Sequence, residues 1–334
     1  MKAWQIISDG GIDALRLTEA EAPQPGPGEV AVRMRANAIN FRDLLTITDP
    51  VARGLPYPRV PNSDGVGEVT ALGAGVNGLK VGDRVASCFF QRWTDGLCSA
   101  EAMASALGGA LDGVLAEEVV LSANGVVPVP AHLTDVEAAT LPCAALTAWN
   151  AVVETGRVKA GDWVLIMGTG GVSIFALQFA RLLGAQTIVT SSSDEKLARA
   201  KDLGATVTIN YRQAPEWEKP VLAATGGVGV DLAVEVVGAA NLPRTINATR
   251  IAGTIALIGA MRGGAIDPAQ FMRRSIRVQG IYVGSRRMFL DMNRAIVAHQ
   301  LRPVIDRTFP FVEAQDAYRR MQSAGHLGKL VIEV

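Results

Sequence analysis

Apolar residues in the middle of the chain follow two spacings in succession. Residues Trp163 to Met167 form a short continuous apolar run, which has the length of a buried strand. The spacing then becomes helical, and Gln186 to Thr190 are interpreted as a second strand. One face of the predicted helix carries Val172, Ala176, Phe179 and Leu183. The pattern therefore predicts a strand, a helix and a second strand.

Glycines separate these predicted elements. Gly168, Gly170 and Gly171 lie between the first strand and the helix, and Gly184 ends the helix as a C-terminal cap. A turn of this kind presents bare N–H groups and a helix N-terminus, which suit a pyrophosphate. Ser173 takes the third glycine position and is small enough for close packing. We predict a dinucleotide-binding βαβ unit here; the alternative is a glycine-rich turn in an ordinary α/β sheet.

Further apolar runs continue this alternation. We expect strands at 187–191, 206–209, 231–237, 254–259 and 278–283, with helices in most of the gaps. Alternation of this type is typical of a doubly wound parallel sheet covered by helices on both faces. The predicted fold class is therefore α/β.

Both ends of the chain show a different pattern. Residues 1–125 contain short apolar strands between Gly- and Pro-rich turns, which predicts a β-rich domain, with 89–118 as an irregular surface lobe. A helix is expected from Thr134, with a break at Pro142. After Gly284 we expect helices near 288–300 and 313–323 and a final strand at 329–334, which we assign to the first domain.

Composition narrows the classes of function. The 334 residues include 32 Lys and Arg and 32 Asp and Glu, so no net charge attracts nucleic acid or an anionic membrane. We find no uninterrupted apolar run of membrane-spanning length and no signal peptide at Met1. Three scattered cysteines make no disulfide framework. A cytoplasmic protein with a small-molecule substrate is the expectation.

The end of the second predicted strand bears on which nucleotide is bound. An acidic residue there would bind the ribose hydroxyls of NAD, but this chain has hydroxyl side chains at 190–193 and Lys196 one turn later. Asp194 is interpreted as the N-cap of the next helix. Charge therefore favours NADP; the alternative is that the serines form a polar turn only.

Several ordered motifs resemble those of the medium-chain dehydrogenase/reductase superfamily, over nearly the full length. They are Asn40-Phe-Arg-Asp43, Pro61-Asn-Ser-Asp-Gly-Val-Gly-Glu68, Gly82-Asp-Arg-Val85, Leu141 to Trp149, Gly168 to Ser173 and Gly325 to Val331. The resemblance implies a GroES-like β-rich catalytic domain (1–143 and 285–334) and a Rossmann dinucleotide-binding domain (144–284).

Zinc relatives in this superfamily hold catalytic metal with a Cys, a His-Glu pair and a second Cys. The corresponding places here read Asn40, Ser63-Asp64 and Cys143, so two plausible ligands remain where three are normal. A structural zinc would need four close cysteines, and residues 88–118 contain only Cys88 and Cys98. The chain resembles the zinc-free, quinone-oxidoreductase-like branch, and no zinc is expected.

Without a metal, the easier hydride acceptor is a quinone or an α,β-unsaturated carbonyl, whose developing charge is spread over several atoms. By resemblance, Asn40 and Tyr57 would orient the substrate oxygen. Asp64 and Arg42 would add polarity or form a structural ion pair, and Asp43 would anchor its loop. An alcohol dehydrogenase or ketoreductase, and a non-catalytic NADP-binding sensor or structural protein, remain the alternatives.

The resemblance also implies a set of cofactor-binding residues. Gly168, Gly170, Gly171 and Val172 would contact the pyrophosphate, and Lys329 the diphosphate. The 2′-phosphate would be faced by Ser191, Lys196 and Tyr211, and the nicotinamide by Thr147, Gly259 and Val283. We expect strand 278–283 to lie at the edge of the sheet and to pair with the same strand of a second copy of the chain, which predicts a homodimer. The physiological substrate and direction, NAD as the alternative cofactor, and a tetramer remain open.

Overall fold

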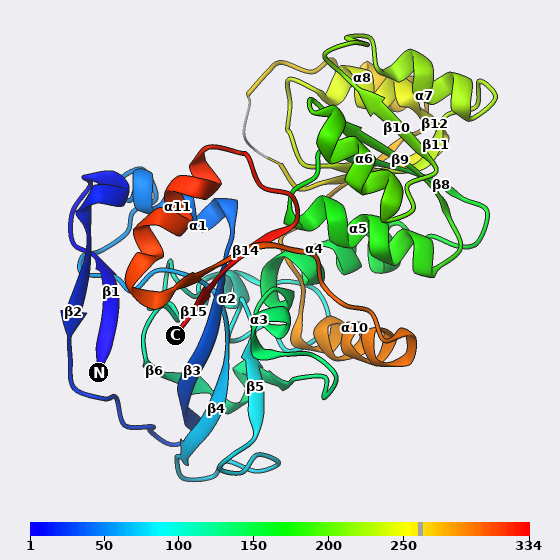
Figure 1. Cartoon of the computed structure of the whole chain (residues 1–334). Helices are drawn as coiled ribbons and strands as arrows, with labels where there is room; N and C mark the ends of the chain where they lie inside the picture. The colour runs from blue at the N-terminus through cyan, green and yellow to red at the C-terminus, as the bar shows by residue number, and fades with distance from the viewer. Residues whose placement is uncertain (260–262) are drawn as a thin grey trace. The chain divides into compact units, whose positions relative to one another are not determined.

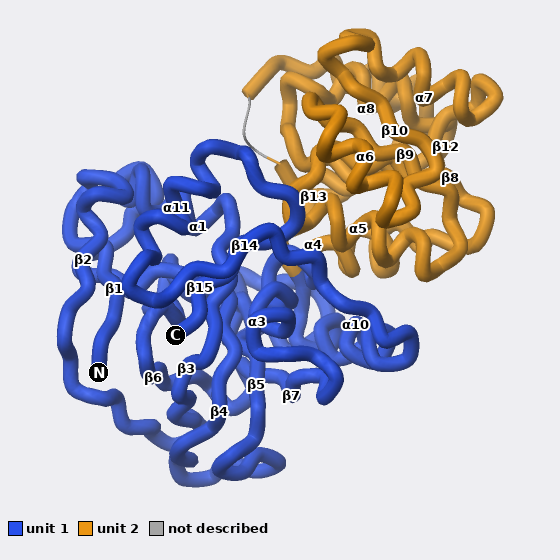
Figure 2. Tube along the Cα trace, viewed as in Figure 1, with its two compact units in different colours: residues 1–146, 284–334 blue, residues 147–283 orange. Residues whose placement is uncertain are grey.

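A computed structural model gives the structure of the protein and describes residues 1–259 and 263–334. The chain divides into two compact units (Figure 2). Unit 1 comprises Met1–Leu146 and Gly284–Val334, and unit 2 comprises Thr147–Val283. The C-terminal segment thus returns to the unit formed by the N-terminal half of the chain.

Unit 1 is built on a largely antiparallel seven-stranded sheet of order β14-β15-β3-β4-β5-β7, with β6 also paired to β3. Its long central strand, β3 (Glu29–Ile39), pairs with both β4 and β15. The other strands of this sheet are β4 (Asp64–Leu72), β5 (Arg84–Ser87), β6 (Glu118–Ser122), β7 (Val126–Pro128), β14 (Ile305–Pro310) and β15 (Lys329–Glu333). β1 (Lys2–Ile6) and β2 (Leu15–Glu19) form a separate antiparallel pair.

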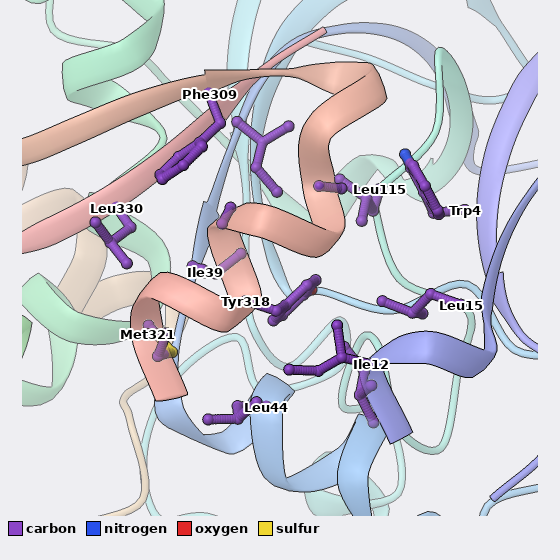
Figure 3. Close-up of a cluster of buried hydrophobic side chains, with 14 of the residues drawn as sticks. Trp4, Ile12, Leu15, Ile39, Leu44, Leu115, Phe309, Tyr318, Met321 and Leu330 are labelled. Atoms are coloured by element: carbon purple, nitrogen blue, oxygen red, sulfur yellow. The ribbon is translucent and has the colours of Figure 1, made fainter. Parts of the chain in front are cut away.

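A buried apolar cluster joins the two ends of unit 1. Side chains from β1 and from helices α1 (Phe41–Thr48) and α11 (Ala314–Gln322) meet there with Leu330 of β15 (Figure 3). The hydroxyl of Tyr318, on α11, donates to Oδ1 of Asn62 inside this core. The remaining helices of unit 1 are α2 (Ala100–Met103), α3 (Asp135–Ala138) and α10 (Arg286–His299).

Unit 2 contains a six-stranded sheet of order β10-β9-β8-β11-β12-β13, in which every pairing is parallel. The predicted α/β doubly wound sheet is therefore confirmed. Its strands are β8 (Trp163–Met167), β9 (Gln186–Ser191), β10 (Val207–Asn210), β11 (Val230–Glu235), β12 (Thr249–Leu257) and β13 (Arg277–Gly280). β11 ends two residues earlier than predicted because the Glu235 side chain accepts the N–H groups of Val237 and Gly238.

Helices cover both faces of the sheet in unit 2. α7 (Glu218–Ala224) and α8 (Leu242–Ala248) lie together on one side, and α5 (Gly171–Leu182) lies on the other (Figure 1). α6 (Asp194–Asp202) packs on β9 and β10, and α9 (Ala269–Arg273) precedes β13.

The buried surface of α5 is wider than its sequence pattern predicts. Val172 and Leu183, placed on the buried face, are only half-buried, whereas Ser173 to Leu177 are all buried. The reason is that α5 packs between β8 and β9 on one side and the helical segment 149–155 on another, where Phe179 meets the Trp149 ring edge-on at 5.4 Å. A helix that packs on two sides does not show a single stripe of apolar residues along its length.

Residues Asp135–Thr155 form one continuous 21-residue helical stretch. It includes α4 (Leu146–Trp149) and two π-helical segments, Leu141–Ala145 and Asn150–Thr155. The expected break at Pro142 corresponds to a change of helix type: α3 ends at Ala138, a turn follows at 139–140, and Pro142 lies at the start of the first π-helical segment, where its missing N–H costs little. By length and composition the stretch could also cross a membrane, but 78% of its most apolar window is buried inside the protein.

The predicted surface lobe at 89–118 is irregular, as expected, but much of it is buried. Phe89, Phe90 and Leu107 are core residues, and Val114 and Ala116 pack into the apolar cluster around β3 and β6. Small residues in this segment permit close backbone contact: a Cβ on Gly113 would lie 2.1 Å from the carbonyl oxygens of Pro61 and Asn62.

Candidate functional site

One candidate site begins where β3 ends and α1 starts, in unit 1. Asn40 occupies the N-cap of α1 and is 7% exposed. The carboxylate of Asp43 accepts a 2.8 Å hydrogen bond from the backbone N–H of Asn40, as in a capping box. Asp43 is therefore placed as the anchor of this turn. Arg42 pairs with Asp43 at 3.1 Å and also donates to the carbonyl of Leu107.

Asp64, the first residue of β4, is fully buried beside this turn. Its Oδ1 accepts from the hydroxyl of Ser63 at 2.7 Å, and its Oδ2 accepts from the backbone N–H of Cys143 at 3.1 Å. These bonds join Ser63-Asp64 to Cys143, the second and third of the positions that carry metal ligands in zinc relatives.

Lys329, at the start of β15, supplies the positive charge of the cluster and is 3% exposed. Its Nζ donates to the carbonyl of Ile39 at 2.9 Å and to Oδ1 of Asn40 at 2.5 Å. It lies 3.9 Å from Oδ2 of Asp64. Lys329 was predicted to meet the diphosphate; the structure places it in this buried network within unit 1.

Burial raises the pKa of Asp64 to about 6, from an ordinary value of 3.8. The Lys329 ammonium opposes this shift, the negative charge of Asp43 adds to it, and the Ser63 hydroxyl and the nearby Asn40 amide oppose it. The carboxyl therefore titrates close to neutral pH, which distinguishes it from an ordinary surface aspartate.

Tyr57 and Cys143 have different surroundings. Tyr57 is 41% exposed, and among the described residues no hydrogen bond joins it to Asn40 or Asp64. Partial desolvation and then the charges of Asp9 and Asp49 raise the pKa of its hydroxyl. Burial, followed by the nearby Asp64 carboxylate, raises the pKa of the Cys143 thiol, which keeps the thiol protonated.

The donor set at this position does not fit a catalytic zinc. Zinc normally takes three protein ligands of thiolate, imidazole or carboxylate type, and the described residues contain no group of three such side chains. Asn40 and Ser63 stand where two of the ligands would be, and the oxygens of Asp64 are engaged by Ser63 and Cys143. A lysine ammonium also lies in the same network.

A second candidate site is the glycine turn between β8 and α5, in unit 2. Gly168 has a φ of +72°, which favours glycine, and Gly170 caps the helix with an extended backbone. A Cβ on Gly170 would meet no atom within 4 Å, so the turn is open on that side. Ser173 is buried, and its hydroxyl donates to the carbonyl of Met167 at 2.7 Å, which fixes the turn to the end of β8. Together with Gly171 and Val172 in the first turn of α5, this arrangement fits a pyrophosphate.

The predicted 2′-phosphate residues converge at the ends of neighbouring strands. Ser191 ends β9 and accepts the backbone N–H of Tyr211 at 3.1 Å, which follows β10. Lys196 lies in the first turn of α6 beside them. The N-cap of α6 is Ser193, whose hydroxyl accepts the N–H of Lys196, so the N-cap prediction for Asp194 is wrong. The Asp194 carboxylate instead accepts from Asn210 and Gln213.

The predicted nicotinamide residues lie around the ends of unit 2. Thr147 is buried at its start, and Val283, at its end, has a φ of +57°. The side chain of Asn150 donates to the carbonyl of Val283 at 2.8 Å and ties these segments together. Gly259 follows β12, and its backbone N–H donates a hydrogen bond to the carbonyl of Glu235.

Two of the residues that organise unit 2 were missed by the sequence analysis. Asn150 is one; the other is Glu235, which is fully buried at the end of β11. Its carboxylate accepts from two backbone N–H groups, the Asn241 amide and the Thr245 hydroxyl. An acidic residue that ends an otherwise apolar strand was the available signal for Glu235.

Known proteins match the whole length of this chain. Residues 26–131 match the alcohol dehydrogenase GroES-like domain and residues 171–298 the zinc-binding dehydrogenase domain. A zinc-type alcohol dehydrogenase-like protein of Schizosaccharomyces pombe is 43% identical over 333 residues, 97% of this chain and 96% of the relative. The crystal structure of an NAD-dependent alcohol dehydrogenase superimposes with a TM-score of 0.91 at 35% identity, covering 100% of both chains. An acryloyl-coenzyme A reductase of Sulfurisphaera tokodaii is 26% identical over 351 residues, 100% of both chains. The chain belongs to the medium-chain dehydrogenase/reductase superfamily, with a GroES-like and a Rossmann domain, and is an alcohol dehydrogenase-like oxidoreductase.

Proposed function

We propose that the protein is a zinc-independent, NADPH-dependent reductase of quinones or α,β-unsaturated carbonyl compounds. The observation that carries the proposal is the exchange of ligands in unit 1: Asn40 and Lys329 form a polar network where zinc relatives hold metal. Bound NADPH would supply a hydride, and the residues of unit 1 would stabilise the negative charge that develops on the substrate oxygen.

Asn40 is proposed as the hydrogen-bond donor to that oxygen. Its Nδ2 is buried and has no hydrogen-bond partner of normal geometry within the described structure, so donor capacity remains for a ligand. Tyr57 is proposed as a second donor, and its raised pKa keeps the hydroxyl protonated at neutral pH. Asp64, with Lys329 beside it, would set the local charge around Asn40.

Charge delocalisation explains the preference for activated acceptors. Reduction of an isolated carbonyl produces a full alkoxide, which benefits from a Lewis acid. Reduction of an enone or quinone spreads the charge over several atoms, so a few hydrogen bonds suffice. The name of the acryloyl-coenzyme A reductase relative, which specifies an activated alkene, supports this substrate class.

For the cofactor, the turn at Gly168, Gly170, Gly171 and Val172 would hold the pyrophosphate, and Ser191, Lys196 and Tyr211 the 2′-phosphate. Thr147, Gly259 and Val283 would line the nicotinamide end. NADP is favoured because β9 ends in Ser191 without a carboxylate. The NAD-dependent relative supports NAD as the alternative.

An alcohol dehydrogenase or ketoreductase is the second candidate function, and the names of two relatives support it.

A small-molecule carbonyl compound or quinone is the proposed binding partner, and we propose no interaction with nucleic acid or membrane. Three free cysteines, two of them buried, are compatible with a cytoplasmic location. We also propose a homodimer formed through β13, the edge strand of the sheet in unit 2.

The proposed function is tested by steady-state oxidation of NADPH and NADH with a panel of quinones, enals, enones, ketones and aldehydes, before and after treatment with EDTA. We expect NADPH-dependent turnover of quinones or enones that is unchanged by the chelator. Loss of activity with EDTA and recovery with Zn²⁺, or turnover of alcohols and simple ketones alone, would support the second candidate. No turnover with any compound would favour a non-catalytic nucleotide-binding protein.

A further inference from the structure

Lys329 and Asn40 lie far apart in the sequence but share a hydrogen bond inside unit 1. The Nζ of Lys329 donates to Oδ1 of Asn40, and both side chains are more than nine-tenths buried. An ammonium group is a donor only, so the atom of the Asn40 amide that faces it must be the oxygen. Because the amide group is planar, Nδ2 then lies on the opposite side of Cγ.

We propose that Lys329 is a positioning residue that locks the Asn40 amide with its N–H groups available to the substrate oxygen. This inference rests on the proposed function and assigns Lys329 a part in it. The buried Nδ2 has no hydrogen-bond partner of normal geometry within the described structure, and an unpaired buried donor is costly unless a ligand completes it.

The neighbouring acceptors show why a lock is needed. Without the ammonium, rotation of the amide by a half-turn would bring Nδ2 toward the carbonyl of Ile39, which Lys329 now occupies. The Asn40 amide is also close enough to Asp64 to contribute to its charge balance. The carbonyl of Ile39 would therefore attract the N–H groups, and the amide oxygen would face Asp64 and the substrate. An oxygen there would repel the developing negative charge.

The pairing of β15 with β3 restricts where the side chain of Lys329 can lie. Its strand, β15, pairs with β3 so that Leu330 lies opposite Ile39, the residue before Asn40. Leu330 and Ile332 enter the apolar cluster on one side of β15, so Lys329 projects from the other side. Register therefore fixes the distance between the ammonium and the end of β3.

The first test is a double-mutant cycle with Asn40→Ala, Lys329→Met and the combined variant, in the full-length protein with an enone or quinone that the wild type reduces. We expect each single change to lower kcat/KM for the acceptor about 10- to 100-fold, the scale for loss of one oxyanion donor. The combined variant should lose at most about threefold more than either single variant, because both changes remove one function. The dissociation constant for NADPH should change less than about threefold.

Other outcomes separate the inference from the proposed function. Losses that multiply in the combined variant would overturn the inference while leaving Asn40 as the oxygen donor. A raised NADPH dissociation constant with unchanged acceptor kinetics in Lys329→Met would also overturn it and return Lys329 to the diphosphate. Full activity of Asn40→Ala would instead contradict the proposed role of Asn40, on which the inference depends.

Three further variants test whether lost activity reflects misfolding and whether Lys329 acts through Asp64, the charged group beside it. Lys329→Gln keeps one donor and should recover part of the activity lost in Lys329→Met. Asp64→Asn, alone and combined with Lys329→Met, removes the charge that Lys329 balances. The loss on adding Lys329→Met should persist in the Asp64→Asn background; its disappearance there would mean that Lys329 acts through Asp64.

A structural measurement tests the inference even if no acceptor is turned over. In crystals of the wild type and of Lys329→Met that diffract beyond about 1.2 Å, the oxygen and nitrogen of an amide can be distinguished. The wild type should place Oδ1 of Asn40 toward Lys329, and the variant should show the amide rotated. An unchanged amide in Lys329→Met would overturn the inference.

Discussion

The backbone N–H of Cys143 lies 3.1 Å from Oδ2 of Asp64 and donates a hydrogen bond to it. The bond links the start of β4 to a π-helical segment 79 residues later in the chain. In this arrangement Cys143 contributes its backbone rather than its thiol, which burial keeps protonated. The carboxylate of Asp64 is in turn held in a buried position where its charge is costly.

Asp64 predicts a specific dependence of stability on pH. Its pKa is about 6 in the folded protein and 3.8 ordinarily, so the folded state binds the proton more tightly than the unfolded state. The stability contribution of this group therefore rises as the pH falls from 7 toward 4. Between pH 7 and pH 5 the gain should be about 1 kcal/mol.

Urea unfolding of the wild type and Asp64→Asn at pH 7 and pH 5 measures this effect. The variant should lack the gain. Asp83→Asn is the control, because the hydrogen bond from Lys80 lowers the pKa of Asp83, so its contribution is lost only below about pH 4. Equal pH dependence in wild type and Asp64→Asn would contradict the assignment.

Gly170→Ala should separate folding from cofactor binding. The φ of −76° suits alanine, and the added Cβ meets no protein atom within 4 Å, so stability should change by less than about 0.5 kcal/mol. The same methyl group would stand where a pyrophosphate approaches the turn, and NADPH affinity should fall at least about tenfold, or ~1.4 kcal/mol. Fluorescence titration with NADPH measures the affinity. Gly280→Ala, also in open space, should leave it unchanged, and unaltered binding by Gly170→Ala would argue against a pyrophosphate at this turn.

Ser191→Asp should reverse the cofactor preference. A carboxylate at the end of β9 would repel the 2′-phosphate of NADPH and accept hydrogen bonds from the ribose hydroxyls of NADH. We expect the ratio of the two dissociation constants to shift at least about tenfold toward NADH, equivalent to ~1.4 kcal/mol. Ser191→Ala, which removes the hydroxyl without adding charge, should cause a smaller shift. A wild type that already binds NADH more tightly would refute the choice of NADP.

Val278→Lys should dissociate the proposed dimer. Val278 lies in β13, at the edge of the six-stranded sheet, and is 38% exposed. Light scattering at micromolar concentration should give twice the 35.2 kDa of one chain for the wild type and one chain for the variant, since a buried, unpaired lysine is unfavourable in an interface. Val228→Lys, at an exposed turn of the same unit, should remain dimeric. A wild-type monomer would end the proposal.

The sequence predicts features of this fold that depend on local rules. Gly168 and Gly184 both have positive φ, as their places in a turn and after a helix require. Parallel strands in unit 2 follow from short apolar runs separated by helices, because such strands are buried on both faces. Ser193 and Asp194 show the limit of this reasoning: adjacent residues are both good N-caps, and only the structure shows which hydroxyl or carboxylate binds the helix.

Long-range contacts could not be predicted in the same way. Lys329 is separated from Asn40 by 289 residues, and a lysine near a chain end is ordinarily exposed. Its burial depends on the register of β15 against β3, which no local pattern records. The wide buried surface of α5 likewise arises from packing on a second side, whereas a sequence pattern shows best the helices that pack on one.

The position of Lys329 on β15 has a consequence for protein synthesis. A nascent chain that has emerged from the ribosome as far as α11 already contains Asn40, Asp64 and Cys143, but it lacks the strand that separates β14 from β3. Until β15 is added, Asp64 lacks the ammonium of Lys329, and one edge of β3 is unpaired along 36–39. Completion of this buried polar network therefore waits for a segment that is translated after all of its other members.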